Sequence, residues 1–385
     1  MINFQKHRNR GVNYRIEVIT DNFVDKDVQS MLRPLNLITN IFFNPFYRIK
    51  NGFIKPNSCI SNCLTFCFLI FTLCLFFYRS YDRVRMKAGI IKSVSVINID
   101  YFTDAFVTIF RHTVIVLYSK NNVMFVLNFV KVNRFLNDEV SFKRLIFGNW
   151  VSVVSLFLIN VFLIFYICLM LGLPSYNLIC GCIYESMDIH VLYAIRLINL
   201  LKHKIELWNC KVFELQSVQG GTLKKGLYKK MFQSYFNILH CYDFYKNFFQ
   251  FLILCHCISY FINNLIHMEL TIEHLPNISL MDQILKLTTN IVWTLKNFIL
   301  EIVLCSEVEK FYKEMQKTQD VCVNMLKENC SSEERQLYKN IQRLHRAKFN
   351  KISVFGLFYV DANLPRRMIA LVANYTIVLL QFAFL

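Results

Sequence analysis

The sequence contains an uncharged apolar run that is long enough to cross a lipid bilayer. Residues 58–78 read SCISNCLTFCFLIFTLCLFFY and include no Asp, Glu, Lys or Arg. Residues 150–172 form a second run of this kind. About 20 apolar residues in a helix span the roughly 30 Å hydrocarbon core of a bilayer. The two runs therefore predict a protein whose helices cross a membrane.

Composition favours helices over a transmembrane β-barrel. Of the 385 residues, 55% are hydrophobic and only 10 are glycine, whereas a barrel needs many turn residues between alternating strands. The formal net charge is +17, which is typical of nucleic-acid-binding proteins or of membrane proteins with basic cytoplasmic loops. The apolar blocks favour the second class, so we expect no nucleic-acid partner.

Seven regions are apolar enough to be counted as spans. They are residues 58–78, 94–118, 150–172, 178–201, 248–268, 281–305 and 368–385. The second, fourth and sixth carry internal charges, such as Asp100, Asp104 and Arg111 in the second. Charged residues within a span usually face protein or a water-filled cavity rather than lipid. We therefore expect an all-α membrane bundle with polar groups inside it.

The seventh span is expected to be split. Residues 352–360 form a short apolar piece, and residues 361–367 separate it from the terminal run. Pro365 lies in the separating segment and cannot donate the backbone hydrogen bond of a continuous helix. The terminal run, residues 368–385, rises about 27 Å as a helix, which is just enough to cross.

The distribution of basic residues predicts the orientation. Lys and Arg are concentrated in residues 1–57, 120–144, 202–246 and 310–351, and they are absent from residues 172–177 and 269–280. Because basic residues accumulate in cytoplasmic loops, we expect a cytoplasmic N-terminus and an extracellular C-terminus in the plasma membrane. The sequon at Asn277 fits an outer glycosylated loop. Residues 79–92 disagree, with five basic residues on the expected outer side.

Two inner segments, residues 202–246 and 306–350, alternate apolar and charged residues at helical spacing. They predict either helices that extend the bundle into the cytoplasm, packed through a stripe that includes Phe311 and Met315, or solvated surface helices. The 14 cysteines lie mostly in apolar runs, where cysteine behaves as a small hydrophobe rather than a zinc ligand. Catalytic motifs are absent from the sequence, so we expect no enzyme activity, metal or cofactor.

The C-terminal residues carry a more specific pattern. Asn374-Tyr375 is followed by five apolar or tolerated residues, Thr376 to Leu380, and then by Gln381-Phe382. This pattern resembles the signature of insect gustatory receptors, which is Thr-Tyr, five apolar residues, and Gln-Phe. Asn374 stands in place of the Thr. Upstream, FGLF at residues 355–358, DANL at residues 361–364 and MLRPL at residues 31–35 are similar to further stretches of that family.

The resemblance implies a ligand-gated, nonselective cation channel that forms a homo- or heterotetramer of gustatory receptor subunits in the lipid bilayer. Residues 1–57 would be cytoplasmic, residues 58–305 would form a six-helix ligand-binding bundle with cytoplasmic extensions, and residues 306–385 would supply anchor helices and the pore-lining span. Sugar-detecting members tend to have an acidic residue after the signature Tyr. Thr376 occupies that place here, which implies a bitter or other non-sugar tastant.

The last helix has a face that suits a pore. At about 100° per residue, Asn374, Val378, Gln381 and Leu385 share one face, and Tyr375 and Phe382 share the adjoining one. The resemblance places the gate at Gln381 and Phe382. In a pore, a ring of amide groups replaces the water of hydration around an ion, and a ring of apolar groups gates by dewetting. The alternative is that the two amides hydrogen-bond neighbouring helices.

The outer halves of the fourth, fifth and sixth spans offer polar and aromatic side chains for a tastant pocket. The candidates are Tyr184, Asp188, Tyr260, Asn264, His267, Asn290 and Trp293. Pockets are mostly apolar with a few placed polar groups, but the same side chains also serve packing between helices. Both interpretations stay open at the level of the sequence.

Two other functions are compatible with seven spans. The first is a seven-helix receptor that signals through a partner and conducts no ions, although G-protein-coupled receptors place their N-terminus outside. The second is a transporter. Transporters usually show repeats with broken helices in both halves, whereas only the last span is interrupted here.

Overall fold

The computed structural model describes residues 22–86, 91–170, 172–217, 221–274, 280–328 and 330–384. Helices dominate the described chain, which confirms the all-α class. They are α2 (Lys26–Ile41), α3 (Cys59–Met86), α4 (Ile91–Leu117), α5 (Ser119–Phe135), α6 (Glu139–Met170), α7 (Ser175–Ser217), α8 (Gly221–His274), α9 (Leu280–Lys327), α10 (Ser332–Lys348) and α11 (Leu364–Phe384). Four short strands form two hairpins: β1 (Arg48–Lys50), β2 (Phe53–Lys55), β3 (Ser353–Val354) and β4 (Phe358–Tyr359).

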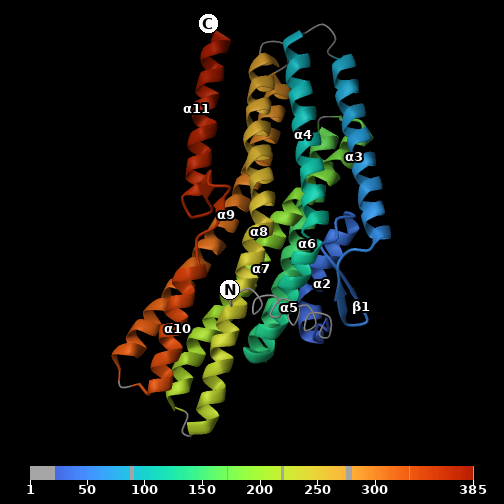
Figure 1. Ribbon diagram of the computed structural model, residues 1–385. Helices are drawn as coiled ribbons and strands as arrows, with labels where there is room; N and C mark the ends of the chain where they lie inside the picture. The colour runs from blue at the N-terminus through green and yellow to red at the C-terminus, as the bar shows by residue number, and fades with distance from the viewer. Residues whose placement is uncertain are drawn as a thin grey trace, which may run out of the picture.

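The long helices run between two ends of the molecule (Figure 1). The C-terminal ends of α3, α8 and α11 and the N-terminal ends of α4 and α9 lie at one end, which we call the upper end. The C-terminal ends of α7 and α9 and the N-terminal ends of α8 and α10 lie at the opposite, lower end, and α2 and β1 lie in the lower half. The segments that are rich in Lys and Arg, residues 202–246 and 310–351, therefore extend toward the lower end, away from the connections that lack basic residues.

In the part of the chain that the structure describes, four helices are long and apolar enough to cross a membrane, judged by length and composition. They are Cys59–Arg85, Phe142–Met170, Ser175–Leu215 and Lys225–Glu269, and the bent pair Asn98–Leu117 and Ser119–Phe135, with 54° between its parts, adds a fifth if it is one span. Two thirds (67%) of the apolar window of α7 is buried, against 17% for α6, so α7 is central and α6 faces outward. The remaining predicted spans fall in α9 and α11, and that these two cross the membrane stays a prediction.

Part of the segment before the first span folds onto the bundle, which the sequence analysis did not predict. One face of α2 is buried, including Val28, Met31, Leu35 and Ile38 at helical spacing. This face packs on α6, where the Asn149 Nδ2 donates a hydrogen bond to the Met31 carbonyl oxygen at 2.8 Å. An amphipathic helix, rather than a mixed charged segment, thus leads into α3.

The β1–β2 hairpin links α2 to α3. Asn51 and Gly52 form its turn with φ values of 53° and 82°. Positive φ at both central residues is the geometry of a type I′ turn, which Asn-Gly favours because its twist matches that of the flanking strands. The hairpin holds Arg48 beside the start of α3, where its Nη1 donates to the Ser58 hydroxyl at 2.8 Å.

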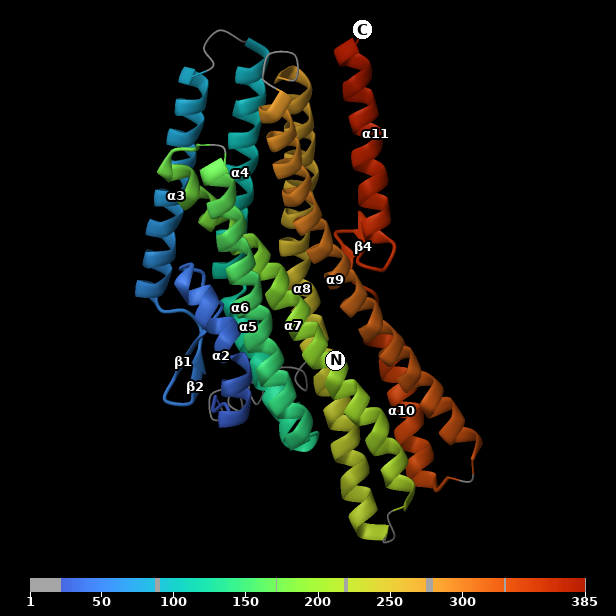
Figure 2. The ribbon, with the colours of Figure 1, turned by 180° about the vertical axis from the view of Figure 1, so that it is seen from behind.

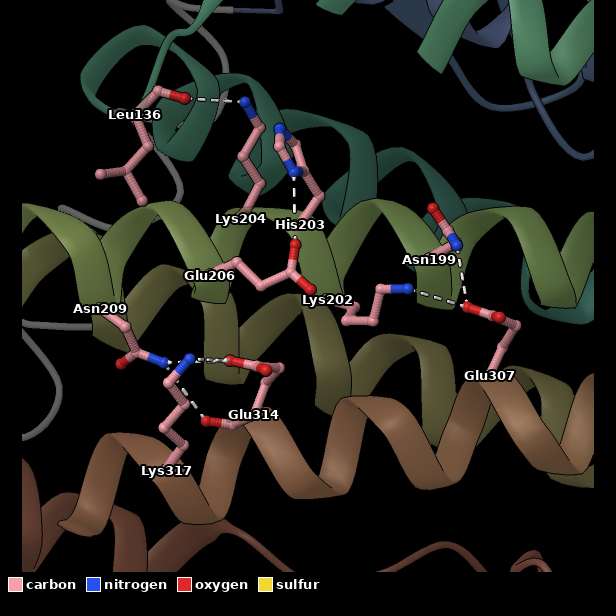
Figure 3. A network of polar contacts seen from close by, with 10 residues as sticks. All are labelled: Leu136, Asn199, Lys202, His203, Lys204, Glu206, Asn209, Glu307, Glu314 and Lys317. Atoms are coloured by element: carbon pink, nitrogen blue, oxygen red, sulfur yellow. Dashed lines mark hydrogen bonds and ion pairs between the residues drawn. The ribbon is translucent and has the colours of Figure 1, made fainter. Parts of the chain in front are cut away.

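Polar contacts join α7 and α9 in the lower half of the molecule (Figure 3). The Asn199 Nδ2 donates to the Glu307 Oε2 at 2.8 Å, and the Lys202 Nζ pairs with the same oxygen at 3.1 Å. Lys204 points to the other side of α7 and donates to the Leu136 carbonyl oxygen at 2.7 Å. These contacts hold α7 between α5 and α9, so the inner segments form a packed stem. Phe311 and Met315 on the predicted stripe are fully buried in this stem.

A buried histidine connects α10 to α8. The His345 side chain is 8% exposed, and its Nδ1 lies 2.6 Å from the Tyr235 hydroxyl. The His345 ring also packs on Phe349, with centroids 4.7 Å apart. Burial lowers the pKa of His345 from 6.5 to about 4, so the imidazole is neutral at pH 7 in the folded protein.

Acidification is expected to destabilise the stem through His345. The unfolded chain binds a proton at the ordinary pKa of 6.5, whereas the folded chain resists protonation until about pH 4. The stability contributed by the neutral ring is therefore complete above pH 6.5 and is lost as the pH falls toward 4. The loss between pH 7 and pH 5 amounts to about 2 kcal/mol. Thermal unfolding of purified His345→Gln protein should lose this part of the pH dependence, and an unchanged profile would contradict the assignment.

The first half of the predicted split span is not helical, which corrects the sequence analysis. Residues 352–360 form the β3–β4 hairpin, closed by the Val360 amide donating to the Ile352 carbonyl at 3.0 Å. Its turn places Phe355 at φ 50° and Gly356 at φ 77°, and this left-handed pair reverses the chain instead of continuing a helix. Pro365 lies in the first turn of α11, where it starts the helix rather than breaking it.

Candidate functional site

The helix α11 lies at the edge of the bundle, beside the upper halves of α8 and α9 (Figure 2). Its first turns are anchored, because Leu364 and Met368 are buried. Beyond them most side chains are exposed within the single chain, including Ile369, Leu371, Ile377 and Leu380. An apolar helix exposed on nearly every side has to be covered by lipid or by other protein chains.

The predicted pore face of α11 is among its exposed surfaces. Asn374, Val378 and Gln381 are all exposed, and the structure gives neither amide a hydrogen bond to another described side chain. Tyr375, on the adjoining face, is half-exposed and packs edge-on against Phe261 of α8, with centroids 5.4 Å apart. Phe382 belongs to α11 but its side chain is not described, and Leu385 lies outside the described residues.

A cavity of about 210 Å³ lies near the upper end, among α3, α4, α6, α7, α8 and α9. Four of the predicted tastant-binding residues line it: Tyr184, His267, Asn290 and Trp293. They come from α7, α8 and α9, so the tertiary fold brings together side chains that the sequence placed only near helix ends. The cavity is somewhat larger than a cavity of about 150 Å³ that holds benzene, so it suits a small molecule.

Two arginines of α3 line this cavity, and the sequence analysis did not predict their role. The Arg79 Nη1 donates to the Tyr184 hydroxyl at 3.0 Å, and its Cζ lies 5.5 Å from the Tyr184 ring centroid. Arg83 forms an ion pair with Asp100 of α4 at 2.9 Å. In the sequence, these two arginines belong to the excess of basic residues in 79–92 that disagreed with the predicted orientation. Arginines that face a cavity do not act as loop charges, which explains the disagreement.

The opposite wall of the cavity is apolar. Ile164 and Ile167 of α6 line it together with Leu173 and Gly181. A Cβ on Gly181 would lie 2.7 Å from the Ile164 Cγ2, so only glycine allows α6 to approach α7 this closely. The site thus combines an apolar wall with guanidinium, phenol, imidazole and amide groups, which is the composition expected of a small-molecule pocket.

The other three predicted residues lie outside the cavity lining, and two of them, Asp188 and Asn264, join helices. The Asp188 Oδ2 forms an ion pair with the Lys296 Nζ at 2.5 Å and accepts a hydrogen bond from the Asn160 Nδ2 at 3.1 Å. The Asn264 Oδ1 accepts from the Thr294 hydroxyl at 2.5 Å, and its Nδ2 donates to the Tyr260 carbonyl at 2.6 Å.

The Asp188–Lys296 pair is connected to the cavity through one aromatic side chain. The Lys296 Nζ lies 3.9 Å from the centroid of the Trp293 ring, which itself lines the cavity. The pair therefore supports the wall of the cavity from behind, and it makes no contact with the cavity of its own.

The other sequence predictions concern glycosylation, the cysteines and metal binding. Asn277 lies outside the described residues, so its glycosylation stays a prediction. Cys168 and Cys180 line the cavity as free thiols. Within the described ranges, no three His, Cys, Asp or Glu side chains are grouped so that they would hold a metal ion.

Comparison of the chain with models of known protein families yields no match, and comparison with curated proteins also yields none. A function for this chain therefore has to be argued from α11, from the cavity and from the sequence pattern itself.

Proposed function

We propose that this chain is a chemosensory receptor of the gustatory type, in which four subunits form a ligand-gated, nonselective cation channel in the plasma membrane. The observation that carries the proposal is the exposure of α11 and of the amides on its surface. It is an apolar helix at the edge of the bundle, and two side-chain amides on its exposed face, Asn374 and Gln381, form no hydrogen bond with the described part of the chain.

An amide that faces lipid is unfavourable, because the hydrocarbon offers no hydrogen-bond partner. Placing four copies of α11 around an axis would turn these amides toward water and ions. Val378 lies between them on the same face and would supply an apolar constriction. The cytoplasmic orientation of the N-terminus, inferred from the basic lower half, places the end of α11 outside the cell.

The cavity would receive the tastant from the upper, extracellular side. Its arginine and amide groups suit a hydrogen-bond acceptor, and its apolar wall and Trp293 suit a ring or short alkyl chain. Such a mixed, small site favours a bitter or other non-sugar compound over a polyhydroxylated sugar. The helix α9 carries Asn290 and Trp293 and also contacts α11, so it would transmit ligand binding to the pore helix.

The proposal is tested by recording currents from cells that express the full chain with an N-terminal epitope. A panel of small bitter alkaloids and phenols should include compounds that evoke inward current. Arg79→Gln should raise the half-maximal concentration of such a compound about tenfold or more, because a hydrogen bond to a charged group contributes about 1.5–3 kcal/mol. Arg85→Gln is the matched control, since Arg85 is exposed on the same helix and does not line the cavity.

Each outcome separates one part of the proposal from the others. An epitope that antibody reaches on intact cells would contradict the orientation and, with it, the channel. Evoked currents that Arg79→Gln leaves unchanged would remove the cavity but not the channel. Ligand-dependent signalling without current in cells with normal surface expression would favour a seven-helix receptor that acts through a partner.

A further inference from the structure

A basic groove lies between α2 and the β1 strand in the lower half of the molecule. Its volume is about 560 Å³, and three cationic side chains line it: Lys26, Arg33 and Arg48. None of the described residues that line it is acidic. Within the described ranges Lys26 and Arg33 form no ion pair, and Arg48 donates a hydrogen bond to the Ser58 hydroxyl.

The acidic residues nearest in sequence leave this charge uncompensated. The Asp25 carboxylate accepts two hydrogen bonds from Arg134, at 2.9 and 3.1 Å. Asp27 is exposed and does not line the groove. On the β1 side, Tyr47, which precedes the strand, adds no charge to the groove, and its hydroxyl shares a hydrogen bond of 3.0 Å with the Tyr193 hydroxyl. A ligand for this groove therefore has to carry negative charge.

Contacts with α3 place the groove at a membrane surface. The Phe43 ring, just after α2, stacks on Phe68 with centroids 5.2 Å apart, and the Phe43 carbonyl accepts from the Thr65 hydroxyl at 2.8 Å. Thr65 and Phe68 lie about 9 and 14 Å from the start of α3, within the part of this helix that carries no charge. Phe43 is thus at hydrocarbon depth, whereas Arg48, bonded to Ser58, is at the level where α3 begins.

An exposed apolar strip continues from the groove toward the hydrocarbon. Leu37 lines the groove and is 47% exposed, and Ile41 and Phe43 follow with 54% and 46% exposed. The same surface of α2 therefore changes from cationic to apolar in the direction of the membrane. Phosphate on the cationic part and acyl chain on the apolar part would match both halves.

We propose that this groove binds the phosphate headgroup of an anionic phospholipid from the adjoining leaflet, with an acyl chain lying on Leu37, Ile41 and Phe43. The inferred orientation makes this the cytoplasmic leaflet, where anionic lipids are concentrated. The bound lipid would hold α2 against α6 and so brace the lower end of the bundle. The site is separate from the cavity and from α11, and it does not depend on the chain conducting ions.

The test measures binding of short-chain lipids to the purified full-length protein in a neutral detergent by microscale thermophoresis. The probes are dioctanoyl phosphatidylinositol 4,5-bisphosphate, dioctanoyl phosphatidylcholine and free inositol trisphosphate. The anionic lipid should bind, and the zwitterionic lipid should not. Lys26→Gln/Arg33→Gln/Arg48→Gln should weaken binding of the anionic lipid about tenfold or more, because each basic residue near an anionic surface contributes measurably.

The matched control removes the same charge from an exposed face of α10, as Lys339→Gln/Arg343→Gln/Arg346→Gln. It should change the affinity by less than about twofold. Leu37→Ser/Ile41→Ser should weaken the lipid but not free inositol trisphosphate, which separates a lipid site from a phosphate site. Arg33→Gln alone, an exposed position, serves if the triple variant fails to fold. Equal loss in the α10 control, or no loss in folded groove variants, would overturn the proposal.

Discussion

Replacing Gln381 with Ala is expected to alter the rectification and lower the unitary conductance of ligand-evoked currents. In the proposed tetramer this change removes a ring of amides from the outer part of the pore and leaves an apolar ring in its place. Apolar rings dewet and impede ions, whereas amide oxygens substitute for water of hydration. The effect should therefore be large even though the Gln381 side chain is exposed and forms no hydrogen bond with the described residues of its own chain.

Gln381→Glu gives the complementary result. A ring of carboxylates attracts cations, so the current should become more strongly cation-selective and should fall when the outer solution is acidified. The control is Ile369→Ala, which shortens an exposed apolar side chain of α11 about 120° around the helix from Gln381. Single-channel recording distinguishes the variants, at symmetric salt for the conductance and under a salt gradient for the selectivity. Currents unchanged by both Gln381 variants, with normal surface expression, would place the pore elsewhere.

Breaking the Asp188–Lys296 pair is expected to be the most destabilising single change in the bundle. The two side chains are only 5% and 9% exposed, and their charged atoms lie 2.5 Å apart. Lys296→Met removes the cation and leaves a buried carboxylate, which typically costs about 3–5 kcal/mol. The same change frees the Trp293 ring from its contact at 3.9 Å, so the cavity wall should also lose order. The loss of stability is measured by heating the protein in detergent and quantifying the remaining folded protein by size-exclusion chromatography.

A double substitution separates charge from packing. Asp188→Leu/Lys296→Met removes both charges and should recover most of the lost stability, because a buried ion pair is often replaceable by apolar side chains. The control is Lys310→Met, whose exposed ammonium pairs with Glu307 at 2.6 Å. Exposed pairs are worth about 0–1 kcal/mol, so this variant should unfold near the wild-type temperature. Equal destabilisation by Lys310→Met and Lys296→Met would contradict the argument.

Periodicity and hydropathy predicted the helices, and they could not predict where a helix is replaced by a turn. The 352–360 segment is apolar enough for half a span, but Phe355-Gly356 adopts positive φ and closes a hairpin. The helix α2 was overlooked for a related reason. Its buried face, at Val28, Met31, Leu35 and Ile38, is interleaved with charges, and only its docking on α6 gives that face a core to bury against.

For the candidate cavity too, residues that stand out in the local sequence were predicted, whereas a contact between residues far apart in the sequence was not. Tyr184, His267, Asn290 and Trp293 were predicted because polar and aromatic residues near the upper helix ends are conspicuous in an apolar background. Arg79 was not predicted, because its partner Tyr184 is 105 residues away in the sequence. Its basic neighbourhood had instead been interpreted as an exception to the rule for cytoplasmic loops.

The sequence by itself determined that the chain is helical with apolar segments long enough to cross a membrane, how its basic residues are distributed, and that Asn374 and Gln381 share one face of the last helix. These properties depend on hydrophobicity and on helical periodicity, which are local. The tertiary structure alone decided which polar groups meet. Arg79 faces a cavity, Asp188 pairs with Lys296 behind it, and Lys26, Arg33 and Arg48 surround an uncompensated groove. The physical reason is that these contacts join side chains far apart in the sequence, and only the packing of the helices decides which of them meet.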